Sequence, residues 1–277
     1  MSIGAYARSV ERMPGLLVHR YRSDHANTPV NAYLVEGSEG VVAVDATLTV
    51  SGGRGLRERA DALGKPLLGA VLTHAHPDHY GGLVELGDIP VFATARVHEV
   101  VRRDDAVKEA ILRPMFGDEW PAERAFPTEV ATDGETIELG DIALTVTDLG
   151  PSESPADSIW TLTREPRRVF SADIAYSRMH CYLADGFAEQ WLASIARLRA
   201  QLEPGTTLHP GHGDPGGLEL LDWQQAYIET MLEAVSEAPE TAADAMRRFL
   251  PSEELAFLME LSVEPLLNGL GSRSPRV

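Results

Sequence analysis

Residues 73–82 read THAHPDHYGG and hold three of the nine histidines of this 277-residue chain, together with one aspartate. The residues that lead into this stretch, LLGAVLTH (67–74), form an apolar run of the length typical of a buried strand. The first histidine therefore falls at the carboxyl end of a strand, where α/β scaffolds carry functional loops. Gly81 and Gly82 close the stretch and leave room for the backbone to bend beneath it.

The histidine stretch has the spacing of a metal-binding motif, H-x-H-x-D-H. Alternate side chains on an extended backbone point the same way, so His74 and His76 can share one cation. The turn that follows presents Asp78 and His79 to a second cation. Imidazole and carboxylate are usual ligands of catalytic zinc and also suit iron. An ordinary polar surface loop is the alternative, and the density of ligand residues disfavours it.

Composition limits the partners of the chain. It contains 24 Lys and Arg against 42 Asp and Glu, a formal net charge of −18. This charge repels phosphate backbones and anionic lipid headgroups, so we expect neither nucleic acid nor a membrane as a partner. The single cysteine, Cys181, excludes an intramolecular disulfide and a cysteine-rich zinc site. The opening MSIGAYARSVERMPG lacks the apolar segment of a signal peptide, and we expect a cytoplasmic protein.

Strand-like and helical segments surround the histidine stretch. The runs at 16–22, 31–37 and 41–47 predict a β-meander, and a helix is expected over 53–64. Helical segments over about 95–120 contain Pro114 and predict an irregular, partly apolar insert.

A second block of strands begins at ETIELGDIALTVTDLG (135–150), and a helix over about 186–202 and a short strand TTLHPGHG follow it. Two blocks of strands flanked by helices predict a two-sheet α/β (α+β) sandwich with outer helices. The tail over 217–270 predicts helices broken at Pro251 and Pro265. Their apolar faces pack on the same domain, with a lid or a homodimer contact as alternatives.

The histidine stretch resembles the signature of the metallo-β-lactamase superfamily, and further motifs of that family follow in the same chain order. VVAVDAT places Asp45 at the end of an early strand, FSADIAY places Asp173 at the metal-bridging position, and HPGHGDPG places His212 at the last histidine position. The resemblance covers about residues 28–216. It implies a four-layer αββα domain over 1–216, with a C-terminal helical extension over 217–277 packed on the same domain.

One position departs from the common pattern of this family. Where most members carry histidine, the chain reads GPSESPADS (150–158), which aligns Glu153. Two histidines and a glutamate form a known catalytic zinc triad, so the first metal remains bindable; a solvated loop carboxylate is the alternative. The added carboxylate lowers the Lewis acidity of the metal pair and favours iron or manganese. Alkylsulfatases and diiron oxygenases of the family are similar in carrying glutamate here, although the alkylsulfatases also have glutamate in place of Asp173.

The resemblance implies a hydrolase with two divalent metal ions, for which we expect zinc, with iron or manganese as alternatives. One ion would be held by His74, His76 and Glu153, the other by Asp78, His79 and His212, with Asp173 bridging them. A shared hydroxide would attack an ester, thioester, lactone or sulfate ester of a small molecule, and Asp78 would orient it and relay its proton. A diiron oxygenase or oxidoreductase and a non-catalytic metal-binding module are the alternatives.

Several further residues are weighed against structural roles. Tyr176 is a candidate oxyanion donor, with packing in the core as the alternative. Asp45 is expected to hydrogen-bond the metal-binding turn. His209 competes with His212, whose G-H-G setting is favoured. The loop 176–186, with His180, Cys181 and Tyr182, is expected to shape the substrate pocket together with the insert at 95–127 and the C-terminal helices.

Overall fold

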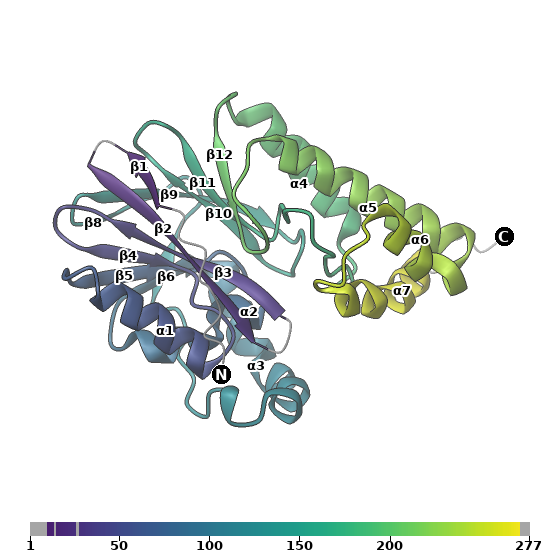
Figure 1. Ribbon diagram of the computed structural model, residues 1–277, viewed down its shortest axis with the longest axis horizontal. Helices are drawn as coiled ribbons and strands as arrows, with labels where there is room; N and C mark the ends of the chain where they lie inside the picture. The colour runs from purple at the N-terminus through teal and green to yellow at the C-terminus, as the bar shows by residue number, and fades with distance from the viewer. Residues whose placement is uncertain (1–9, 14, 26–27, 272–277) are drawn as a thin grey trace.

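Two β-sheets packed face to face form the centre of the computed structural model, which describes residues 10–271 apart from 14, 26 and 27 (Figure 1). The first sheet has the order β1-β2-β3-β4-β5-β6-β7 and the second the order β12-β11-β10-β9-β8. The first contains β1 (Val10–Met13), β2 (Leu16–His25), β3 (Thr28–Glu36), β4 (Val41–Val44), β5 (Leu67–Val71), β6 (Val91–Thr94) and β7 (Glu129–Ala131). The second contains β8 (Thr136–Leu139), β9 (Ile142–Gly150), β10 (Asp157–Leu162), β11 (Arg168–Ala172) and β12 (Thr207–Pro210).

Helices cover the outer faces of both sheets (Figure 1). Those on the side of the first sheet are α1 (Val50–Asp61), α2 (Pro77–Tyr80), the 3-10 helix η1 (Gly81–Leu86), α3 (Ala95–Phe116) and the 3-10 helix η2 (Gly117–Glu119). Those on the other side are α4 (Ala188–Gln201), α5 (Glu219–Glu237), the 3-10 helix η3 (Pro239–Thr241), α6 (Ala242–Phe249) and α7 (Ala256–Gly271). Helices α5 to α7 project beyond the sheets (Figure 1). None of the helices in the described part of the chain has the length and apolar character of a membrane span.

The alternation of side chains along the strands creates three apolar layers. In β4, Val41 and Ala43 pack toward the helices of the first sheet, whereas Val42 and Val44 pack toward the second sheet. In β10, Trp160 faces the first sheet and its neighbour Ile159 faces α4 and α5. Successive side chains of a strand point to opposite faces, so each sheet buries both faces. The expected four-layer αββα architecture is confirmed.

Parallel pairing brings the carboxyl ends of several strands to one edge of the sandwich. Strand β4 is parallel to β5 in the first sheet, and β11 is parallel to β12 in the second. Hydrogen bonds join the two sheets close to this edge: Ser158 donates its backbone N–H to the Thr73 carbonyl at 2.8 Å, and the Trp160 indole donates to the Leu72 carbonyl at 3.0 Å. The loops that leave these strand ends therefore meet in one region.

Gly81 and Gly82 allow the histidine stretch to lie directly on the loop after β4. A Cβ atom at Gly81 would lie 2.2 Å from the Leu48 carbonyl oxygen, and one at Gly82 would lie 2.1 Å from the Ala46 carbonyl oxygen. No side chain fits at such distances. The expectation that these glycines leave room for the backbone is confirmed.

Two expectations about the helices are wrong. The insert over 95–120 is not irregular: α3 is one helix that continues through Pro114 to Phe116, although the proline removes one backbone hydrogen bond from its last turn. Pro265 does not break the last helix but lies inside α7, where burial of Met259 and Leu266 in the core outweighs the local penalty. The break at Pro251 is confirmed, between α6 and α7. The polar residues 1–9, which supported the absence of a signal peptide, lie outside the described residues.

Candidate metal centre

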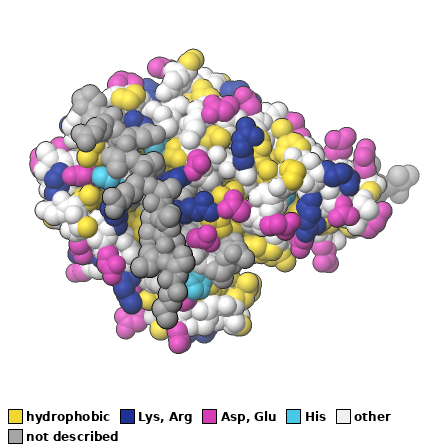
Figure 2. All heavy atoms as spheres, viewed as in Figure 1, with side chains coloured by type: hydrophobic (Ala, Val, Ile, Leu, Met, Phe, Trp, Pro, Cys, Tyr) yellow, Lys and Arg dark blue, Asp and Glu magenta, His cyan; other side chains and the backbone are white. Residues whose placement is uncertain are grey.

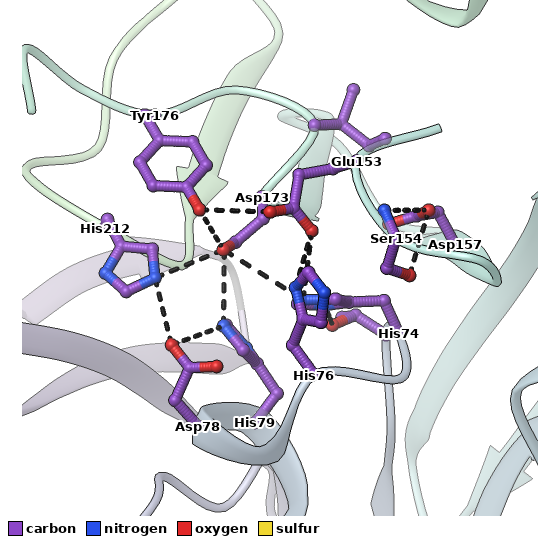
Figure 3. A network of polar contacts seen from close by, with 12 residues as sticks. His74, His76, Asp78, His79, Glu153, Ser154, Asp157, Asp173, Tyr176 and His212 are labelled. Carbon is purple, nitrogen blue, oxygen red and sulfur yellow. Dashed lines mark hydrogen bonds and ion pairs between the residues drawn. The ribbon is translucent and has the colours of Figure 1, made fainter. Parts of the chain in front are cut away.

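Seven side chains from four segments, which follow β5, β9, β11 and β12, converge at the edge where the strands end (Figure 3). They form two groups, within each of which the ligand atoms lie within 4.8 Å of one another. The first group consists of His74, His76 and Glu153, and the second of Asp78, His79, Asp173 and His212. The structure thus brings together every residue for which a metal-ligand role is expected.

Asp173 lies between the two groups. Its Oδ2 is 4.0 Å from Nε2 of His74 in the first group and 3.1 Å from Nε2 of His212 in the second. Its Oδ1 is 3.3 Å from Nε2 of His79. A carboxylate in this position can offer an oxygen to each of two neighbouring ions.

Each of the four histidines is anchored through one ring nitrogen and turns the other toward the cluster. His79 donates from Nδ1 to Asp45 at 2.8 Å, and Nδ1 of His212 donates to the Pro29 carbonyl. Nδ1 of His74 lies 3.0 Å from the Thr73 hydroxyl, whose proton is donated to Asp45. In the neutral, metal-binding form of His74, His79 and His212, these partners hold the ring proton on Nδ1 and leave Nε2 free.

The anchoring role of Asp45 agrees with the expectation that it hydrogen-bonds the metal-binding turn. Its carboxylate accepts the Thr73 backbone N–H at 2.9 Å as well as the hydroxyl. Asp45 itself has a φ of +60°, a left-handed conformation that aspartate tolerates better than most residues. One carboxylate therefore orients two of the four histidines.

The buried polar atoms of the cluster test whether cations fit it. Nε2 of His74, His79 and His212, Oε2 of Glu153 and Oδ1 of Asp173 are buried and make no hydrogen bond to any described residue. Leaving a buried polar atom unsatisfied costs about 1–3 kcal/mol, so five such atoms facing one space favour cations that accept their lone pairs. Nitrogen and oxygen donors of this kind suit zinc, iron and manganese.

The charges of the cluster also favour the binding of cations. Burial raises the pKa of Glu153 to about 7, against the influence of His76. Burial also opposes ionisation of Asp173, but the neighbouring His212 and His79 hold its pKa well below the usual range. The neighbouring carboxylates of Asp173 and Asp78 raise the pKa values of His79 and His212 despite the burial of both rings. The site thus concentrates negative charge that protons or cations must balance.

Sequence reasoning missed two aspartates that support the cluster. Asp185 accepts a hydrogen bond from Nε2 of His76 at 2.9 Å and so leaves Nδ1 facing Glu153, at 2.8 Å from its Oε2. Asp157 accepts the backbone N–H of Ser154 at 2.8 Å and shapes the loop that carries Glu153. An aspartate at the end of a serine-rich loop is a signal for such a turn, whereas nothing in the sequence pairs Asp185 with His76.

Tyr176 combines the two roles considered for it. Its hydroxyl donates to Oδ2 of Asp173 at 2.7 Å and lies 3.3 Å from Oε1 of Glu153. Its ring is buried and stacks on His212, with the centroids 4.8 Å apart. Tyr176 therefore belongs to the polar network (Figure 3) and also packs in the core.

Three further residues considered in the sequence analysis, His209, His180 and Cys181, lie apart from the cluster, whereas Tyr182 lies beside it. His209 packs between the rings of Tyr33 and Phe170, and His180 bonds Tyr227 and the Ser252 carbonyl. Burial raises the pKa of the Cys181 thiol well above its usual value, which disfavours a nucleophilic role. Tyr182 is the exception because it lines the pocket and its ring meets His76 edge-on.

The cluster forms the floor of a pocket of about 950 Å³, measured with the part open to solvent. Helix α3 and the segment that begins α7 supply the walls, and Tyr182 lies at the side. The expectation that the 95–127 insert, the 176–186 loop and the C-terminal helices shape the pocket is therefore confirmed.

Comparison with known proteins gives matches over most of the chain. The model of the metallo-beta-lactamase superfamily matches residues 26–212. Acyl-coenzyme A thioesterase MBLAC2 of Gallus gallus is 32% identical over 214 residues, which cover 69% of this chain and 75% of that protein. The Homo sapiens protein of the same name is 31% identical over 220 residues, with the same coverage.

The fold agrees with these matches. A beta-lactamase domain protein from Burkholderia ambifaria has a TM-score of 0.68 at 21% identity, covering 94% of this chain and 86% of that one. The chain therefore belongs to the metallo-beta-lactamase superfamily and is a metal-dependent hydrolase of it.

Proposed function

We propose that this chain is a dinuclear thioesterase, which uses two bound divalent metal ions to hydrolyse a thioester of a small molecule. Zinc is the metal that we expect. The observation that carries the proposal is the set of five buried ligand atoms that lack a hydrogen bond to a described residue and lie in two adjacent groups, with Asp173 of the second group 4.0 Å from His74 of the first. The thioester is suggested by the relatives named as acyl-coenzyme A thioesterases. The single cysteine agrees with a reducing compartment, the cytoplasm.

In this proposal the two groups of the cluster hold one ion each. His74, His76 and Glu153 would bind the first ion, Asp78, His79 and His212 the second, and Asp173 would contact both. When bound, the pair supplies a water that ionises near neutral pH and a Lewis acid for the carbonyl oxygen. In the overall reaction, water adds its oxygen to the acyl carbon, the C–S bond breaks, and the thiol leaves with a proton.

Asp78 is the most exposed of the three carboxylates of the cluster that line the pocket. Its side chain is 26% exposed, whereas Glu153 and Asp173 are buried. Its Oδ2 lies 3.2 Å from Nε2 of His212. In this place Asp78 can hold the attacking water by a hydrogen bond and pass its proton toward the departing sulfur.

Tyr176 lines the same pocket as Asp78 and would act on the carbonyl oxygen of the substrate. Burial raises its pKa well above the usual value, and Asp173 and Glu153 raise it further. The hydroxyl therefore keeps its proton at neutral pH. It can stabilise negative charge on the carbonyl oxygen, provided that it turns from Asp173 toward the substrate.

Iron is the second candidate for the two ions, because three carboxylates among seven ligands suit iron. Carboxylic esters, lactones and sulfate esters are the alternative substrates. The relatives named as thioesterases favour thioesters over them.

Thiol release from acetyl- and octanoyl-coenzyme A tests the proposal. We expect activity in protein purified with its metals, loss on removal of the ions by a chelator, and recovery with added Zn²⁺. His76→Ala should abolish activity, whereas the matched variant His98→Ala, on α3 and outside the cluster, should keep it. Activity that survives complete metal removal, or two iron ions per chain with no hydrolysis, would refute the dinuclear thioesterase.

A further inference from the structure

Helix α3 turns a row of apolar side chains toward the pocket rather than toward the first sheet. Ile111, Leu112, Met115 and Phe116 line the pocket, and their spacing of one, three and four residues places them on one side of the helix. Two of them are exposed to an unusual degree for large apolar residues: Ile111 is 55% exposed and Met115 63%. The described residues leave Ile111 and Met115 largely uncovered, whereas Phe116 is buried.

The start of α7 supplies the facing wall. Phe257, Leu258 and Leu261 line the same pocket, and Leu261 is 59% exposed. Figure 2 shows apolar side chains gathered beside the notch between the lower part of the molecule and the lobe of C-terminal helices. The two rows together form what we name the α3–α7 groove, lined by Ile111, Leu112, Met115, Phe116, Phe257, Leu258 and Leu261.

The groove is continuous with the metal cluster. His76, Asp78 and Glu153 line the same pocket as the apolar rows, so one bound molecule can touch both. Lys108 is the one cation among the described residues that line the pocket. Since the rest of the groove is apolar, it fits an uncharged hydrocarbon chain better than a polyanion.

The length of the groove limits the chain that it can hold. Residues 108–116 of α3 span eight helical steps, roughly 12 Å, which matches an extended chain of about ten carbons. We propose that the α3–α7 groove binds the acyl chain of the substrate, and that Ile111, Met115 and Leu261 select medium or longer unbranched acyl chains over short ones. This inference rests on the proposed thioesterase function and names its substrate class.

The three side chains offer a clean test because they are exposed, so replacing them by serine removes apolar contact surface without emptying the core. The test variant combines Ile111→Ser, Met115→Ser and Leu261→Ser. The control variant combines Val107→Ser and Leu267→Ser, which lie on the same two helices, are 61% and 41% exposed, and do not line the pocket. Both variants should unfold at the temperature of the wild type.

Two measurements are then made on the metal-loaded protein. The first is kcat/KM for acetyl-, octanoyl- and decanoyl-coenzyme A. We expect decanoyl to be the preferred substrate of the wild type and the control variant. In the groove variant kcat/KM for decanoyl should fall at least about tenfold, while that for acetyl changes less than about twofold. The second is calorimetric binding of S-decyl-coenzyme A, a thioether that cannot be hydrolysed, with a similar loss expected in the groove variant.

The outcomes distinguish acyl-chain binding in the α3–α7 groove from thioester hydrolysis at the metal cluster. Absence of thioester hydrolysis, with thioether binding that the groove variant loses, would overturn the thioesterase and keep the groove as an acyl site. Hydrolysis with the same chain-length preference in wild type and groove variant would overturn the groove and keep the thioesterase. A dimer in solution that the groove variant converts to monomer, with the chain-length preference unchanged, would mean that a second copy covers these residues and would also overturn the inference.

Discussion

Glu153→Gln is the substitution that tests the metal centre most directly, because it preserves the shape of the side chain and removes its negative charge. Glu153 is 1% exposed, and its Oε2 lies 2.8 Å from Nδ1 of His76 and 3.7 Å from Nε2 of His74. Zinc sites with four ligands have apparent binding free energies of about 10–16 kcal/mol, or roughly 3 kcal/mol per ligand. Loss of one charged ligand should therefore weaken the first ion by about a hundredfold.

The assay is elemental analysis after dialysis against a chelator of graded concentration, with wild type and variant side by side. We expect the wild type to retain two ions under conditions in which Glu153→Gln retains one, held by the group of Asp78, His79 and His212. Glu153→His is the matched control, because it restores a neutral nitrogen ligand, and it should keep both ions. Two ions of unchanged affinity in Glu153→Gln would show that Glu153 is no ligand and would refute the assignment of the first group.

Three further predictions follow from the contacts around the cluster. Asp185→Asn removes the acceptor that fixes the His76 ring, so the affinity of the first ion should fall about 10–100-fold; unchanged affinity in a metal titration would contradict this role. Tyr176→Phe should lower kcat and leave the metal content intact, and unchanged kcat would remove its hydroxyl from the reaction. The pKa values of His79 and His212 are raised in the metal-free protein, so both rings hold protons at neutral pH and an incoming ion must displace them. Zinc uptake should therefore release protons and strengthen as the pH rises, which calorimetry in buffers of different ionisation enthalpy measures; uptake at pH 7 without proton release would be inconsistent with these shifts.

The helices show where local sequence patterns mislead. Pro114 and Pro265 were expected to disturb their helices, and both lie inside α3 and α7. A proline removes one hydrogen bond from a helix, and the packing of the surrounding turns decides whether the helix continues. That packing involves residues distant in the chain, so the local pattern does not contain it.

The sequence by itself determined which residues belong to the cluster. The spacing of THAHPDHYGG, with Asp45, Asp173 and His212 at strand ends in the same order as in the family, identified the candidate metal ligands, the aspartate that supports them and the αββα architecture. Such motifs are local: two-residue periodicity sets which side chains share a face, and glycines mark where the backbone bends closely.

Only the tertiary structure decided how the cluster is supported and what lies above it. His76 and Asp185 are separated by 109 positions, and the apolar row of α3 faces that of α7 across the pocket although more than 130 residues lie between them. An exposed Ile111 or Leu261 looks like any other surface residue in the sequence. Which surfaces face each other is set by the packing of the two sheets and their outer helices, a sum of many weak contacts between distant parts of the chain.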